Sequence, residues 1–297
     1  MTKNVIFAVL ATALSLFSTN AKAEADPNFY IYLCIGQSNM EGQGTIEDCD
    51  LSPDERFQMM STLDCGTRKQ GQWYRAIPPL ARCDTRLCPA DYFGRTMVAN
   101  LDEGHRVGVV VVAIGGIKID LYDPDGWQSY VKSMNEDWQI NSVNAYGGNP
   151  LARLIECAKE AQKSGVIKGI LLHQGESDAY NDAWIQRVKK VYENLLTELN
   201  LKSEDVPLIA GEVGGADQNG ICAGANNTID RLPRPFPRPT SSLPLVAHCR
   251  ATTCISILRA TANWAAAMPR PCSPRWASKP ISTRTKCPRW IIQSLST

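Results

Sequence analysis

The chain has 297 residues, of which 44% are apolar and 21% are charged, so it is long enough to bury one sizeable core. That composition excludes a collagen, a coiled coil and a wholly disordered chain. The net charge of +1 hides a break, because residues 1–230 hold all 30 Asp and Glu and carry −10, whereas residues 231–297 carry +11. The basic segment also holds 10 of the 18 Pro and no Gly. Such a segment is typical of a polyanion-binding tail, and equally of DNA translated in the wrong frame.

Residues 1–23 have the pattern of a secretory signal peptide. Lys3 supplies the positive charge of the N-terminal region, and the apolar run from Val5 to Phe17 is shorter than a typical transmembrane helix. The end of this segment, Ala21-Lys22-Ala23, has the small-x-small pattern of a cleavage site. We expect cleavage after Ala23 and a mature protein that is secreted or periplasmic, with no membrane association after cleavage.

The rest of the chain up to residue 233 alternates short apolar runs with amphipathic segments. In chain order we predict a strand at 29–35, a long decorated loop at 43–90, a helix at 91–100, a strand at 106–114, a helix at 150–163, a strand at 166–172, a helix at 184–199 and a strand at 207–210. This alternation predicts one α/β domain over residues 24–233 with a parallel sheet. Residues 234–297 are expected to be irregular, poorly ordered and to add no strand, since Pro removes backbone donors.

Cysteine usage fits an exported protein, in which disulfides are permitted. Cys34 and Cys157 lie in apolar patterns and are predicted to be buried thiols. Four further cysteines share the loop-rich stretch and are candidates for disulfides of open connectivity, namely Cys49, Cys65, Cys83 and Cys88.

Three predicted strands are followed at once by polar, Gly-containing turns. These turns are residues 36–40, 115–117 and 173–178. In a parallel sheet the carboxyl ends of the strands meet at one rim, where ligands bind. The three turns are therefore expected to converge.

Each turn carries a residue with two open interpretations. Ser38 could present a nucleophilic hydroxyl and aim its own N–H at an oxyanion, or could be an ordinary turn serine. The Gly115-Gly116 pair could bring an N–H to a substrate or only turn the chain. Gln174 could donate its amide to an oxyanion or be a core amide. His173 is a candidate base, but it would sit among the oxyanion donors.

Taken together, the three turns resemble the sequence blocks of the SGNH-hydrolase superfamily, most closely its sialate O-acetylesterase and acetylxylan esterase branch. The matching segments are Gly36-Gln37-Ser38-Asn39-Met40, Gly115-Gly116 and His173-Gln174-Gly175-Glu176-Ser177-Asp178. The resemblance covers about residues 28–233. It implies a flavodoxin-like, three-layer α/β/α sandwich and hydrolysis of acetyl esters on carbohydrates.

The resemblance also assigns roles to residues. Ser38 matches the nucleophile, and Gly116 and Gln174 match the groups that complete the oxyanion hole with the Ser38 N–H. The neighbouring polar residues Gln37, Asn39 and Glu176 are candidate substrate contacts. The expected partner is an acetylated carbohydrate, with no nucleic acid, and neither a metal nor an organic cofactor is implied.

The general base that this family places near its C-terminus, as Asp-x-x-His, is missing. The chain has three His, namely His105, His173 and His248, and none stands in that motif. No Asp occurs after Asp230. As written, the triad is incomplete and the chain is expected to be nearly inactive.

A shifted reading frame restores the missing block. In this frame, each new codon consists of the last base of one written codon and the first two bases of the next. For residues 251–268, such codons can encode Asp-His-Leu-His-Phe-Asp-Ser-Ala-Gly-Tyr-Arg-Glu-Leu-Gly-Arg-Arg-Tyr. The genetic code leaves no choice at two positions. The shifted codon that spans Asn263 and Trp264 must encode Leu, and the one that spans Trp264 and Ala265 must encode Gly. The same frame permits a Cys near residue 247, which we expect to pair with Cys222.

Two other hypotheses stay open at this point. One is a non-catalytic carbohydrate-binding relic, which aromatic residues expected in loops would favour, namely Trp73, Tyr74 and Trp127. The other is a polyanion-binding module centred on the tail, although that tail has no amphipathic period and lacks a stacking platform.

The first prediction concerns the coding DNA. We expect that correcting one inserted or deleted base near the codons of Pro233 or Arg234 gives a reading frame that encodes an intact Asp-x-x-His block in place of the present tail. Resequencing of the gene checks this, with the region encoding residues 28–200 as the internal control. An actively expressed gene whose DNA encodes the tail as written would contradict it.

Overall fold

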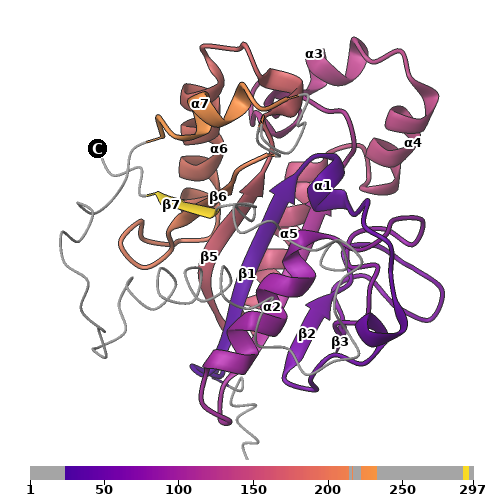
Figure 1. Cartoon of the computed structure of the whole chain (residues 1–297), viewed down its shortest axis with the longest axis vertical. Helices are drawn as coiled ribbons and strands as arrows, with labels where there is room; N and C mark the ends of the chain where they lie inside the picture. The colour runs from indigo at the N-terminus through magenta and orange to yellow at the C-terminus, as the bar shows by residue number, and fades with distance from the viewer. Residues whose placement is uncertain (1–23, 214–215, 217–221, 233–289, 294–297) are drawn as a thin grey trace, which may run out of the picture.

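A computed structural model describes residues 24–213, 216, 222–232 and 290–293 (Figure 1). The predicted signal segment and most of the basic tail lie outside the described residues, as do the expectations that fall on them. In the described part of the chain, no helix is long and apolar enough to cross a membrane.

The centre of the molecule is a seven-stranded sheet with the order β3-β2-β4-β1-β5-β6-β7. β1, β2, β4, β5 and β6 run parallel, whereas β3 and β7 are antiparallel to their neighbours. The strands are β1 (Phe29–Gly36), β2 (Phe57–Met60), β3 (Trp73–Arg75), β4 (Arg106–Ala113), β5 (Val166–His173), β6 (Leu208–Gly211) and β7 (Trp290–Gln293). The predicted strands are thereby confirmed, with ends shifted by one residue.

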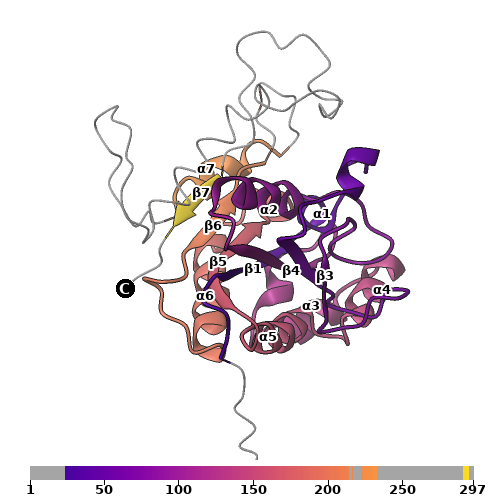
Figure 2. The same ribbon diagram turned by 90° about the horizontal axis from the view of Figure 1, so that it is seen from below.

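Helices cover both faces of this sheet, so the predicted three-layer α/β/α class is confirmed (Figure 2). The helix α2 lies on one face, and α5 and α6 lie on the other. The α-helices are α1 (Ser38–Glu41), α2 (Pro89–Asn100), α3 (Trp127–Lys132), α4 (Asp137–Ala145), α5 (Pro150–Ala161), α6 (Trp184–Glu198) and α7 (Ala225–Ile229). Short 3-10 turns are η1 (Asp48–Leu51), η2 (Ile119–Tyr122) and η3 (Glu176–Asp178).

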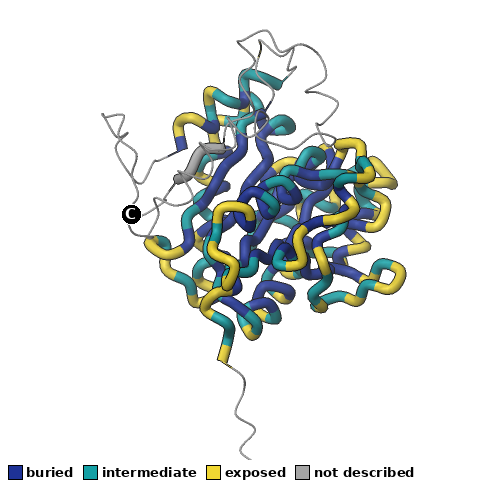
Figure 3. Tube along the Cα trace, turned by 60° about the horizontal axis from the view of Figure 1, so that its bottom comes forward, coloured by how far each residue is buried: buried dark blue, intermediate teal, exposed yellow. Residues whose placement is uncertain are grey.

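The central strands have no solvent-facing side, which is why they appear in the sequence as continuous apolar runs. In β1, Leu33 and Ile35 join the core under α5 and α6, whereas Tyr32 and Cys34 join the core under α2. Figure 3 shows this buried trace enclosed by more exposed loops.

The strand order creates a switch point at β1. The chain passes from β1 to β4 on one side, then crosses to β5 on the other side. In such sheets the ligand crevice opens at the carboxyl ends of the two strands where the direction reverses. The turns after β1 and β5 border that crevice.

Two expectations are wrong. The stretch 43–90 is more than a loop, because β2 joins the sheet parallel to β4 and β3 forms its edge. The tail was expected to add no strand, yet residues 290–293 form β7, which pairs with Leu208–Gly211 of β6.

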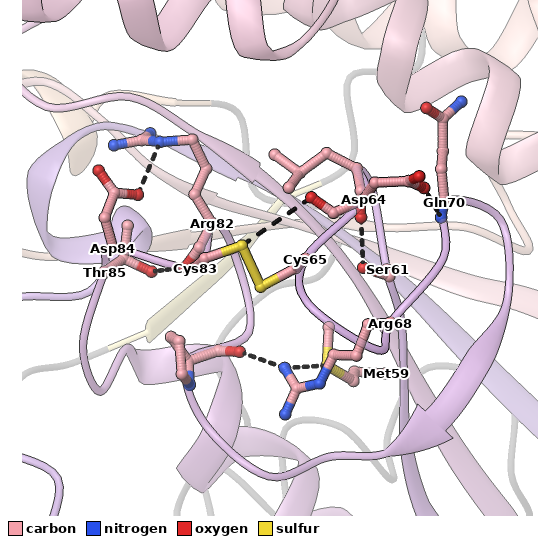
Figure 4. The surroundings of a disulfide bond; sticks show 12 residues. Met59, Ser61, Asp64, Cys65, Arg68, Gln70, Arg82, Cys83, Asp84 and Thr85 are labelled. Atoms are coloured by element: carbon pink, nitrogen blue, oxygen red, sulfur yellow. Dashed lines mark hydrogen bonds and ion pairs between the residues drawn. A yellow bond between two sulfur atoms is a disulfide. The ribbon is translucent and has the colours of Figure 1, made fainter.

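The same stretch contains a disulfide. Cys65 and Cys83 are bonded with their Cα atoms 5.6 Å apart, which settles one pair among the four candidates (Figure 4). Cys88 is a free thiol, and the sulfur of Cys49 lies 3.9 Å from Oδ1 of Asp50. The free thiols Cys34 and Cys157 are buried, as predicted.

The second prediction concerns Gly36, the last residue of β1. A Cβ there would lie 2.3 Å from the carbonyl oxygen of His173 and 2.7 Å from the Cβ of Met40. β1 and β5 would have to separate, so Gly36→Ala should lower the free energy of unfolding by about 3 kcal/mol. Denaturant unfolding measures this.

The matched control is Gly104→Ala, because a Cβ at Gly104 would meet no atom within 4 Å. This variant should change the free energy of unfolding by less than about 0.5 kcal/mol. Equal effects of the two substitutions would contradict the close approach of the strands at Gly36.

Candidate active site

Ser38 is the first residue of the short helix α1, directly after the central strand β1. Gln37 separates the strand from the helix, and its backbone N–H donates to the carbonyl of His173 at 3.0 Å. The Ser38 hydroxyl forms no hydrogen bond with any described residue, and neither does its backbone N–H. Both groups are therefore available at the crevice.

The turn after β4 brings a second backbone N–H to this rim. Gly115 is buried and Gly116 is exposed with φ at +67°, a conformation that favours glycine. The N–H of Gly116 has no acceptor within the described part of the chain. The turn abuts α1, since a Cβ on Gly115 would lie 2.9 Å from a carboxylate oxygen of Glu41.

The side chain of Gln174 lies where the turn after β5 begins. Its oxygen accepts from the indole N–H of Trp184, which fixes the orientation of the amide. Its Nε2 lies 2.6 Å from Oδ2 of Asp178, but 3.2 Å from Oε1 of Gln37 and 3.3 Å from the carbonyl of Ile117. One N–H is thus committed to Asp178, and the other has only the two longer contacts.

Asp178 joins the turns after β4 and β5, and sequence reasoning assigned it no role. Its side chain is 3% exposed. Besides Gln174, it accepts from the N–H of Ile119 at 2.9 Å and from the amide of Asn181 at 2.8 Å. A carboxylate with several internal donors is well suited to hold both turns in place.

Gln37 performs a similar task between the turns after β1 and β5. It is 3% exposed, and its Oε1 accepts from Nε2 of Gln174 at 3.2 Å. The backbone N–H groups of Gly175 and Ser177 lie 3.4 and 3.3 Å from the same oxygen. Its position is thus internal, with the side chain turned away from solvent.

Asn39 and Glu176 form a polar pair beside Ser38. The amide of Asn39 donates to Oε1 of Glu176 at 2.6 Å. Burial raises the pKa of the Glu176 carboxyl, and the hydrogen bond from Asn39 partly offsets this. Oε2 of Glu176 is buried and has no hydrogen-bond partner among the described residues.

A hollow of about 350 Å³ opens next to this pair. Its lining combines charged and polar groups with one exposed ring. The lining residues are Lys118, Glu176, Ser177, Asp178, Ala179, Tyr180, Asn181 and Cys222. Mixed donors and acceptors of this kind suit a polyhydroxylated ligand.

A buried ion pair supports the rim from the opposite side. Arg82 and Glu41 are 8% and 4% exposed, and their side chains are 2.7 Å apart. Arg82 also donates to the carbonyl of Ala113 at 3.1 Å, so it links α1 to the end of β4. The irregular sequence around Arg82 gave no signal of this contact.

None of the described histidines is hydrogen-bonded to Ser38. His105 lies just before β4, at the opposite end of the strand from the crevice, where its ring faces Tyr30. His173 is 6% exposed, and its Nε2 lies 3.2 Å from the carbonyl of Glu212. Burial lowers the pKa of the His173 imidazole. His248 lies outside the described residues.

No group of three or more His, Cys, Asp and Glu is placed to hold a metal ion within the described ranges. Two of the aromatic residues expected in loops do not line the crevice. Trp73 packs on Phe29 with ring centroids 4.7 Å apart, near the start of β1. The hydroxyl of Tyr74 accepts from the backbone N–H of Lys69.

Residues 28–234 match the family model described as carbohydrate esterase, sialic acid-specific acetylesterase. The chain belongs to this family of carbohydrate esterases. The predicted resemblance is thereby confirmed at the level of the family. The family match ends at residue 234, beside the point where the charge of the chain changes sign.

Three solved structures that are similar to this chain have low sequence identity to it. A protein from Arabidopsis thaliana is 20% identical with a TM-score of 0.49, covering 68% of this chain and 80% of its own. NanS is 16% identical with a TM-score of 0.47, and the match covers 69% of this chain and 75% of the NanS chain. A carbohydrate acetylesterase from Xanthomonas citri is 17% identical with a TM-score of 0.38, and the match spans 60% of this chain and 40% of that one.

The third prediction concerns Asp178. Asp178→Ala leaves the Gln174 amide, the Ile119 N–H and the Asn181 amide without their buried acceptor. We expect the free energy of unfolding to fall by about 3 kcal/mol, because unsatisfied buried donors are costly. Denaturant unfolding followed by circular dichroism measures the change.

Asp182→Ala is the control, since Asp182 is exposed and forms no hydrogen bond or ion pair with a described residue. Its effect should stay within about 0.5 kcal/mol. An Asp178→Ala variant as stable as the Asp182→Ala variant would show that the turns hold together without the carboxylate.

Proposed function

We propose that this chain has the scaffold of an exported carbohydrate O-acetylesterase with Ser38 as nucleophile, and that the chain as written lacks its general base. The observation that carries the proposal is the position of Ser38. It follows the central strand at the switch point, with a hydroxyl that has no partner among the described residues. Membership of the carbohydrate esterase family supports the substrate class.

In the proposed reaction, Oγ of Ser38 attacks the carbonyl carbon of a sugar acetyl ester while a base takes the hydroxyl proton. The tetrahedral intermediate then releases the sugar oxygen, which receives that proton, and leaves an acetyl group on Ser38. A water molecule then attacks the acetyl-serine and gives a proton to the base. The bond from the acyl carbon to Oγ breaks, Oγ of Ser38 takes that proton back, and acetate departs.

Two backbone N–H groups would stabilise the negative oxygen of both intermediates. Those of Ser38 and Gly116 have no acceptor in the described part of the chain. The exposure of Gly116, with Gly115 buried, favours Gly116 as the donor. The less committed N–H of Gln174 is the third candidate, and preorganised donors of this kind contribute strongly to acyl transfer.

The base is the missing part. A serine hydroxyl at its ordinary pKa is a weak nucleophile without a neighbouring proton acceptor. The end of the family match at residue 234 supports the proposal that a frame slip near Pro233 removed the Asp-x-x-His block. The shifted reading of residues 251–268 permits such a block.

Asn39 and Glu176 are proposed to contact the hydroxyl groups of the sugar. The Oε2 atom of Glu176, which has no hydrogen-bond partner among the described residues, and the adjacent hollow support this assignment. Gln37, placed among the substrate contacts from the sequence, is better suited to positioning, because its oxygen serves the turn after β5. We propose export because residues 1–23 have the pattern of a signal peptide. Acetyl esters of sialate or xylan are the proposed substrates because of the family resemblance.

A second function is a carbohydrate-binding relic of the same fold. The specific observation in its favour is that a polar hollow and two available N–H groups remain beside a serine without a base. Such a protein would bind an acetylated sugar and release it unchanged. A catalytic assay separates it from an esterase interrupted by a frame slip.

The fourth prediction uses that assay, with an aryl acetate as substrate. The written chain and its Ser38→Ala variant should both be slow and equal within error, since loss of a triad member costs several orders of magnitude. The frame-restored chain should be at least about 1,000-fold faster than its own Ser38→Ala variant.

Ordinary esterase rates in the written chain, abolished by Ser38→Ala, would overturn the missing-base account. A frame-restored chain that folds, binds the sugar and stays slow would favour the binding relic.

A further inference from the structure

We propose that Trp138 is the surface on which the sugar ring of the acetylated carbohydrate stacks, an inference that rests on the proposed function. Trp138 lies in the first turn of α4. Its side chain is 49% exposed, although large aromatic residues are on average well buried. Among the described residues, two other large apolar side chains are exposed, namely Leu51 and Tyr180.

The indole ring of Trp138 covers the glycine turn after β4. A Cβ on Gly115 would lie 3.4 Å from two ring atoms of Trp138, and one on Gly116 would lie 3.6 Å from the nearest ring atom. The ring thus lies against the glycine turn that carries the N–H proposed to hold the acetyl oxygen. An acetyl group bound there would bring its sugar close to the indole.

Contacts within α4 and with the glycine turn hold the backbone that carries the ring. The carbonyl of Trp138 accepts from the hydroxyl of Ser142 at 2.8 Å. The next residue, Gln139, donates to the carbonyl of Gly115 at 3.2 Å, which ties α4 to the glycine turn. A positioned ring loses little conformational freedom when a ligand covers it.

The chemistry of the surroundings fits a carbohydrate. A pyranose ring has an apolar face of C–H groups and an equator of hydroxyl groups, so it needs an aromatic surface on one side and polar groups at its edge. Trp138 provides the first at the turn after β4, and Asn39, the residue after Ser38, provides the second together with Glu176. In Figures 1 and 2, α4 lies on one side of α1 and α7 on the other.

The other candidate ring beside the site is Tyr180. It is 93% exposed and lines the hollow with Cys222. Only a small part of its surface is covered by neighbouring groups, so its orientation is less restricted than that of the Trp138 indole. Tyr180 therefore serves as the comparison in the test.

The test is binding by the full chain as written, because a protein that lacks its base leaves the probe intact. The probes are an O-acetylated xylo-oligosaccharide and O-acetylated sialic acid, titrated by calorimetry and by ligand-observed NMR. Trp138→Ala should weaken binding of at least one probe about tenfold. It should also remove the upfield shift that the indole ring causes in the NMR signals of the sugar-ring protons. Trp138→Phe should retain part of the affinity and part of the upfield shift.

Leu51→Ala is the matched control for truncating an exposed apolar side chain, and circular dichroism checks that each variant is folded. Unchanged affinity and unchanged upfield shifts in folded Trp138→Ala would overturn the role of Trp138 and leave the proposed carbohydrate function standing. The same holds if Tyr180→Ala, and not Trp138→Ala, removes the shifts. No binding of either probe to the unaltered folded chain would instead overturn the carbohydrate function, and this inference with it.

Discussion

The hydrogen bonds that join the turns after β1, β4 and β5 are the constraint on which the site depends. Gln37 connects the first turn to the third, and Asp178 connects the third to the second. Gln174 contacts both of these side chains. All three residues are at most 3% exposed, so bulk solvent competes little for their hydrogen bonds. Because the network is internal, it can hold the oxyanion donors in place whether or not a base is present. The crevice would therefore stay ordered even in a chain without the base that we propose for Ser38.

The sequence predicted the centre of the fold well, for a physical reason. β1, β4 and β5 are buried on both faces, so they must be continuous apolar runs, and such runs are visible without any knowledge of their partners. The long helices α5 and α6 were predicted from their amphipathic period, since each packs one face on the sheet. The convergence of the three turns followed from the rule that carboxyl ends of parallel strands share a rim. Ser38, Gly116 and Gln174 were placed at this rim by that argument and by the family resemblance.

The remainder depended on contacts between residues that are far apart in the sequence. β2 has four residues within a stretch rich in Cys, Pro and Gly, so its pairing with β4 gave no periodic signal. β7 was missed because a composition rich in Pro and Arg predicts irregular chain, whereas its pairing depends on the open edge of β6. Asp178 stood in a recognised motif, but its bond to Ile119 spans 59 residues and could not be deduced. Trp73 and Trp138 show the same limit, since only the fold reveals which ring is packed on Phe29 and which one lies at the crevice.

The central claim is that Ser38 is a nucleophile whose activating base was lost with the reading frame. Covalent labelling with a fluorophosphonate tests it most directly, because this reagent captures a serine only when a base has activated it. After brief exposure, peptide mass mapping should find one phosphonyl group on Ser38 of the frame-restored chain. The written chain should remain unlabelled under the same conditions. Equally fast labelling of Ser38 in the written chain, or labelling of a different serine in the restored chain, would contradict the account.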